Sequence, residues 1–226
     1  TGFYSSTHEP EPIFESALYG AAGIAHHAPL TKLLLEHGAD PNDGETPYHV
    51  PEGYENDAFK AVFESGKLNS DSQATLLLRK IDFHDAPAIA WLLDQGLSPN
   101  LSGRWGKTAL QSAIVRGNAL QIIQLLLDRG ADASFPSKAG NAVELAAQYG
   151  RADVLDELSA RNIPLPTRPL DQLLVACAGD RPSEISAITC SNPEVIDELR
   201  AFAGRYLAEF AGSGNLNGVK QLWPSN

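Results

Sequence analysis

Two stretches of this sequence decide the fold: Leu33-Leu34-Leu35-Glu36-His37-Gly38-Ala39-Asp40-Pro41-Asn42 and Leu125-Leu126-Leu127-Asp128-Arg129-Gly130-Ala131-Asp132-Ala133-Ser134. The segment from Trp91 to Asn100 fits the same template, and a weaker copy spans residues 62–69. In each copy an apolar run ends at a glycine, the residue that best adopts the left-handed conformation found at helix ends. A pattern that recurs along a chain in this way indicates a repeat architecture.

A second recurring segment lies about twenty residues before these glycines. Its copies are short, cover residues 16–22, 46–49, 108–113, 141–147 and 171–176, and are mostly small or apolar. Thr46 and Thr108 stand where a helix N-cap belongs. We therefore expect units of helix, turn, helix and polar extended turn, beginning near residues 16, 46, 74, 108, 141, 171 and 205. Because the helices are short, the units gain stability by stacking.

The pattern Thr-Pro-Leu-His-Leu-Ala-Ala, Gly, Leu-Leu-Leu, Gly-Ala-Asp-x-Asn is that of the ankyrin repeat. Thr46-Pro47-Tyr48-His49 and Gly38-Ala39-Asp40-Pro41-Asn42 are its most literal copies here, so the sequence resembles the ankyrin-repeat family over residues 16–163 and, more loosely, over 164–226. The resemblance implies an all-α fold: an ankyrin-like α-solenoid of about seven helix-turn-helix repeats with finger turns, over residues 13–226. Residues 1–12 are expected to form a flexible tail.

Some units depart from the pattern. Pro51 and Gly53 interrupt the expected first helix of the second unit. The sixth unit contains Pro182 and Pro193, so its second helix should be short or displaced. In the last unit, Trp223 is expected to cover the end of the core.

Composition excludes several classes of protein. The chain has 17 basic and 28 acidic residues, a net charge of −11, which argues against a general nucleic-acid binder. Residues 1–58 hold ten of the acids and one base, Lys32, for a net of −9. No apolar stretch is long enough to cross a membrane. The sequence contains no Met, which favours a piece of a longer product, and a cytoplasmic location is the favoured interpretation.

Catalytic chemistry has little support in the sequence, which lacks the Gly-x-Ser-x-Gly and His-Glu-x-x-His motifs. All six histidines lie within the first 84 residues, but their spacing favours structural roles over a metal site. We align His26 and His84 with Asn118 as polar helix-start residues, and the resemblance gives His49 a local hydrogen bond that holds its turn. Two cysteines are interpreted as buried free thiols: Cys177 and Cys190. We therefore predict no catalytic residue, metal or cofactor.

The resemblance places partner contacts on the finger turns and on the exposed side of the first helices. Carried onto this sequence, the partner-binding candidates are Arg104, Trp105, Lys107, Arg116, Lys138 and Tyr149, with Glu45, Tyr54 and Asp82 in the second and third units; Val115, Ile81 and Gln148 lie beside them. Trp105 lies in a polar turn and is either an interface anchor or local packing against the neighbouring finger. By contrast, Trp91 replaces the first Leu of a Leu triplet and should lie in the core, as should Phe59 and Phe63.

These features predict a non-catalytic protein–protein interaction module that presents a rigid surface to another protein. One alternative is a regulatory or targeting domain excised from a larger enzyme, so the remainder of a longer parent chain is a candidate partner. Another is a metal-dependent function in the His-rich N-terminal units. The acidic residues between positions 36 and 57 either steer a basic partner or form a solvated face. No nucleic-acid or membrane partner is expected.

Overall fold

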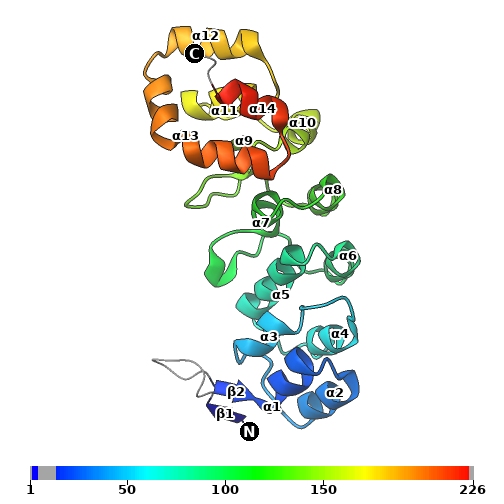
Figure 1. The fold of residues 1–226 in the computed structure, drawn as a ribbon. Coiled ribbons are helices and arrows are strands. Elements are labelled where there is room, and N and C mark those ends of the chain that lie inside the picture. The colour runs from blue at the N-terminus through cyan, green and yellow to red at the C-terminus, as the bar shows by residue number, and fades with distance from the viewer. Residues whose placement is uncertain (1, 5–13, 224–226) are drawn as a thin grey trace. The chain divides into compact units, whose positions relative to one another are not determined.

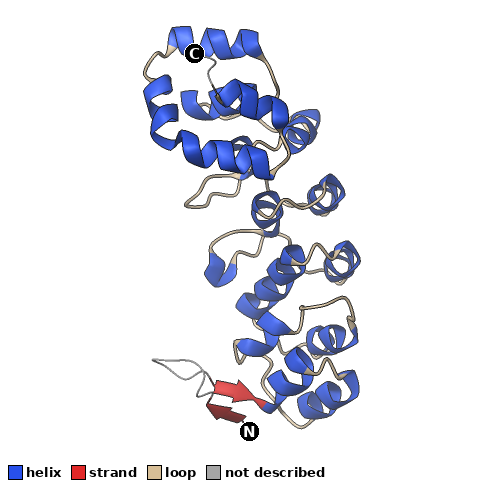
Figure 2. Ribbon diagram, viewed as in Figure 1, coloured by secondary structure: helices blue, strands red, loops and turns tan. Residues whose placement is uncertain are grey.

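A computed structural model describes residues 2–4 and 14–223 (Figure 1). The chain forms two compact units, one up to Ser112 and one from Ala113. Apart from two short strands near the N-terminus, the described elements are helices, which confirms the all-α prediction (Figure 2). No helix in the described part of the chain has both the length and the apolar character needed to cross a membrane.

The first unit begins with an antiparallel strand pair, β1 (Gly2–Tyr4) and β2 (Phe14–Ser16), in which Phe3 is opposite Glu15. Residues 5–12 of the expected tail lie outside the described residues. The other elements of the unit follow in order: α1 (Ala17–Tyr19), η1 (Gly20–Ile24), α2 (Ala28–Glu36), α3 (Glu45–His49), α4 (Asp57–Glu64), α5 (Ser70–Asp82), α6 (Ala86–Asp94) and η2 (Gly103–Trp105).

The packing of the first unit brings α3 between η1 and α5, while α2 packs against α4 and α5 packs against α6 and η2. Phe59, Leu77, Ile89 and Leu92 are fully or almost fully buried in its core. Trp91 and Phe63 were expected to be core residues, but both are only half-buried, because their rings meet edge to face at the margin of the core, with 5.4 Å between the ring centroids.

The second unit receives the end of α7 (Ala109–Val115) and continues with α8 (Leu120–Asp128), α9 (Ala142–Gln148), α10 (Ala152–Ala160), α11 (Pro169–Ala178), α12 (Pro182–Ser191), α13 (Val195–Gly212) and α14 (Leu216–Leu222). In the described residues the helices follow one another in pairs. We propose that these pairs correspond to the seven repeats expected from the sequence. Two starts differ from the expected positions: α5 begins about one turn before residue 74, and α13 begins at Val195, well before residue 205.

Helix α12 buries none of its residues, whereas α11 packs against α9, α12, α13 and α14. The ring of Phe210 lies between Gly150 and Gly218, where an added Cβ would come within 2.5 Å and 2.6 Å of it. The expectation that Trp223 covers the core is wrong: Trp223 is 66% exposed, and Leu222 is buried instead.

Left-handed residues end the helices as the sequence predicts. Gly38, Gly66, Gly96 and Gly130 all have positive φ. The alignment of His26 and His84 with Asn118 is wrong. Both histidines lie in the turn between the two helices of a pair and also have positive φ. They therefore match Gly117 and Gly150, the left-handed glycines of other pairs, and not Asn118.

Candidate functional site

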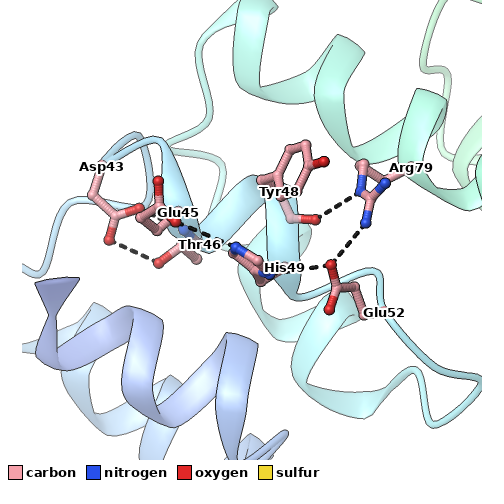
Figure 3. Close-up of polar contacts among 7 residues, drawn as sticks. All are labelled: Asp43, Glu45, Thr46, Tyr48, His49, Glu52 and Arg79. Atoms are coloured by element: carbon pink, nitrogen blue, oxygen red, sulfur yellow. Dashed lines mark hydrogen bonds and ion pairs between the residues drawn. The ribbon is translucent and has the colours of Figure 1, made fainter. Parts of the chain in front are cut away.

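The site begins at the short helix α3. Gly44, with φ of 91°, precedes it, and Asp43 accepts hydrogen bonds from the Thr46 amide at 2.7 Å and the Thr46 hydroxyl at 2.8 Å (Figure 3). The carboxylate of Asp43 therefore plays the capping role that the sequence assigned to Thr46, whose side chain is buried. In α7 the assignment is confirmed, because the Thr108 hydroxyl accepts from the Gln111 amide.

One face of α3 begins a chain of charged contacts. His49 lies 3.3 Å from a Glu45 oxygen through Nε2 and 3.1 Å from a Glu52 oxygen through Nδ1 (Figure 3). Both contacts are local, as predicted for His49. No group of three or more His, Cys, Asp or Glu residues in the described ranges is arranged to hold a metal ion.

Arg79 joins α5 to this face. Its guanidinium lies 2.7 Å from Glu52, and its Nε donates to the carbonyl of Tyr48 at 3.1 Å (Figure 3). The guanidinium also lies 2.9 Å from Asp82. The same group stacks 4.1 Å from the centre of the Tyr48 ring. With its charge paired and only 15% of its side chain exposed, Arg79 fixes the α3 surface against α5.

Trp105 extends the surface from η2. Its Nε1 donates to the Thr75 hydroxyl at 3.4 Å, and its ring lies 6.1 Å from that of Tyr48. The turn is anchored by Asp71, which accepts from the Arg104 amide and pairs with the Arg104 guanidinium at 3.6 Å. Trp105 remains 44% exposed, so one part of the indole packs on α3 and α5 while the rest faces solvent.

The surface formed by Glu45, Tyr48, His49, Glu52, Asp71, Arg79, Asp82, Arg104 and Trp105 is hereafter the α3–α5 surface. Its local electrostatics are acidic. The pKa of nearby Tyr19, whose ring lies 5.2 Å from that of His49, is raised, first by burial and then by the charges of Glu15, Glu45 and Glu52.

The other candidates of the first unit lie differently. Tyr54 is 71% exposed, and its hydroxyl donates to the Phe83 carbonyl at 3.0 Å, while Lys107 is half-buried. Ile81, suggested beside them as a surface residue, is fully buried in α5.

The second unit brings two candidates together: Arg116 and Tyr149 both line a pocket of about 200 Å³ at the ends of α7 and α9. Lys138 is exposed in the turn between α8 and α9, apart from that pocket. Sequence reasoning predicted two buried thiols, but only Cys177 is buried and Cys190 is exposed, because α12 buries no residue.

Several residues of the α3–α5 surface were missed by the sequence patterns, most importantly Arg79, Tyr48 and Glu52. Glu52 and Arg79 are far apart in the sequence, and their pairing needs the chain turn that Pro51 and Gly53 introduce. Starting the third unit at residue 70, where Asn69 accepts from the Ser72 amide as an N-cap, would have placed Asp71 on its first helix together with Arg79.

Comparisons with known proteins agree with this architecture. Residues 77–166 match the family model of ankyrin repeats in three copies. "Ankyrin repeat and SAM domain-containing protein 6" of Danio rerio is 31% identical over 190 residues, 81% of this chain and 24% of that protein. "Ankyrin repeat and SOCS box protein 6" of Homo sapiens is 28% identical over 138 residues, 59% of this chain and 27% of that protein. The chain thus spans about a quarter of the length of these relatives.

A solved structure shares the fold. The crystal structure of the ankyrin repeat domain of Bcl-3, described as a unique member of the IkappaB protein family, superposes with a TM-score of 0.55. The match covers 67% of this chain and 71% of that one at 19% sequence identity, so the likeness is one of fold.

Proposed function

The chain is an ankyrin-repeat protein, and from this premise we propose that it binds a partner protein across the α3–α5 surface. Ankyrin repeats are protein–protein interaction modules, and the partner and its contact residues are the part that we propose. The observation that carries the proposal is Trp105, which is held by contacts with α3 and α5 and is 44% exposed. An exposed, pre-positioned indole beside Arg104 has the composition of an interface hot spot.

The charges of the surface favour a basic partner segment. Four carboxylates surround the aromatic residues (Glu45, Glu52, Asp71 and Asp82), against two guanidinium groups, those of Arg79 and Arg104. Both arginines already pair with these carboxylates. A segment that places an apolar side chain against Trp105 and Lys or Arg beside the carboxylates would match the surface in shape and charge.

Affinity capture from the native source, followed by mass spectrometry, tests the proposal. The wild-type chain is compared with Trp105→Ala and with Trp223→Ala, a control that removes another exposed indole. A partner retained by the wild type and the control but lost from Trp105→Ala supports the surface. A partner retained equally by all three proteins places its binding elsewhere.

A further inference from the structure

A carboxylate is buried in the first turn of α11, a helix that packs against α9 and α13. The residue is Asp171, which is only 3% exposed. Its Oδ1 is buried and has no hydrogen-bond partner within the described part of the chain. A buried charge without a full set of hydrogen bonds is unfavourable. Asp171 lies in the second unit, so the α3–α5 surface gives this charge no role.

The charges around Asp171 leave it short of a cation. Arg168, one turn earlier, lies 4.0 Å from the Asp171 carboxylate, which is farther than a hydrogen bond. The same guanidinium forms a closer ion pair with Glu198 of α13. Glu144 of α9 adds a third carboxylate, whose charge also acts on Asp171. Three carboxylates thus surround one guanidinium, and the buried one is farther from it than Glu198 is.

Neutral groups complete the surroundings of Asp171. The Gln148 side chain of α9 forms a hydrogen bond with its carboxylate. On α13, burial raises the pKa of the Tyr206 hydroxyl, Arg205 opposes that rise, and the charge of Asp171 adds to it. The charges of the other helices that pack against α11 are paired elsewhere or exposed: Asp153, Asp156 and Glu157 on α10, Glu184 on α12, and Lys220 on α14.

We propose that Asp171 is a proton-binding site built into the fold, and that its protonation on mild acidification strengthens the packing of α11 against α9 and α13. A neutral carboxyl group costs much less to bury than a carboxylate. Protonation also removes one of the three negative charges that face a single guanidinium. In addition, a protonated carboxyl group can donate a hydrogen bond, which a carboxylate cannot.

The pKa of Asp171 gives the direction of the effect on stability. Burial raises this pKa, and the charges of Glu144 and Glu198 raise it further, against the charge of Arg168 and the hydrogen bond from Gln148. Because the folded value lies above the unfolded value of about 3.9, the folded chain holds this proton more tightly than the unfolded chain. The stability that this group contributes is therefore present at low pH and is lost as the pH rises through the folded value.

The test is a carbon-13 NMR titration of the side-chain carboxyl group of Asp171 in the full chain, from pH 8 to pH 3. A residue-specific signal is needed because Asp153, in the same unit, has a pKa below its ordinary value and therefore the opposite effect on stability. We expect the midpoint of Asp171 to lie above the ordinary value of about 3.9. A midpoint at or below that value would overturn the proposal.

Two substitutions on α13 test whether the charge cluster acts on Asp171. Glu198→Gln removes one negative charge and frees Arg168 from its closer ion pair, so it should shift the midpoint of Asp171 to lower pH. Asp197→Asn, at the adjacent residue, whose side chain is 83% exposed, is the matched control and should leave the midpoint unchanged. The same midpoint in Glu198→Gln as in the wild type would contradict the proposed cluster.

Asp171→Asn tests the effect on packing, because it keeps the shape of the side chain and is neutral at every pH. Urea unfolding is followed through the amide signals of α13. At pH 7 the variant should unfold at a higher urea concentration than the wild type, and the gap should narrow on acidification and close below about pH 4. A missing gap at pH 7, or one that does not depend on pH, would refute the proposal. If the variant does not fold, the midpoints of Asp171 in wild type, Glu198→Gln and Asp197→Asn decide.

Discussion

Replacement of Lys80 by Met tests whether a buried ion pair holds the 50–56 segment beside the α3–α5 surface. Lys80 is fully buried, and its Nζ donates to Asp85 at 3.0 Å and to the Gly53 carbonyl at 2.8 Å. Met preserves the length and apolar character of the side chain but leaves both acceptors without this donor. Breaking a buried pair by removing one partner costs about 3–5 kcal/mol, and we expect a loss in that range.

The assay is equilibrium unfolding in urea, read by circular dichroism at several pH values. Burial alone would raise the pKa of Asp85, but hydrogen bonds from Lys80, Asn56 and the Ala88 amide lower it. Because the pKa of folded Asp85 lies below its unfolded value of about 3.9, its contribution to stability is present above that pH and is lost as the pH falls through the folded value. The difference in stability between wild type and Lys80→Met should therefore narrow below about pH 4.

Two further variants make the result interpretable. Lys32→Met removes an exposed lysine on α2 and should change stability by less than about 0.5 kcal/mol. Adding Asp85→Asn to Lys80→Met removes the unpaired charge and should recover about 1 kcal/mol or more. A loss below about 1 kcal/mol for Lys80→Met, with no recovery in the double variant, would refute the reasoning.

Three other substitutions or measurements test the packing. Gly218→Ala places a Cβ 2.6 Å from the Phe210 ring, so it should destabilise the folded chain by about 1–3 kcal/mol in thermal unfolding. In a Phe210→Leu background the same substitution should cost less or stabilise the chain, and an equal cost in both backgrounds would exclude the clash. Trp91→Ala should cost about 2 kcal/mol, less than for a fully buried indole, and a change below about 0.5 kcal/mol would mean that its contacts with Phe59 and Phe63 contribute little. A disulfide reagent at pH 8 should label Cys190 in the folded chain and Cys177 only on unfolding, because burial raises the pKa of Cys177 to about 12. Fast labelling of both cysteines in the folded chain would contradict the burial of Cys177.

The repeats could be predicted from the sequence because their signals are local. Gly38, Gly96 and Gly130 follow Leu-rich runs and take the left-handed conformation that the pattern requires. The same conformation at His26 and His84 was missed, because glycine is the residue type that indicates a left-handed conformation in a sequence.

The binding surface was only partly predictable. Glu45, Asp82 and Trp105 were found from their positions in the units, but Arg79, which links Glu52, Asp82 and Tyr48, was not. Its role depends on the path of residues 50–56, which is set by tertiary contacts. The exposed Cys190 was missed for a similar reason, because α12 lies where it buries no side chain.

The most direct test of the α3–α5 surface begins with peptides that are selected for binding to the wild-type chain from a displayed random library. Their affinity is then the measured quantity. Each peptide is measured by isothermal titration calorimetry against wild type, Trp105→Ala and Trp223→Ala, with the melting temperature of each protein recorded. We predict that Trp105→Ala weakens binding at least tenfold, about 1.4 kcal/mol or more, while Trp223→Ala binds like the wild type. Because part of the Trp105 ring packs on α3 and α5, we expect Trp105→Ala to stay folded and to lose about 1–2 kcal/mol of stability. Peptides that bind folded Trp105→Ala as tightly as the wild type would contradict the account.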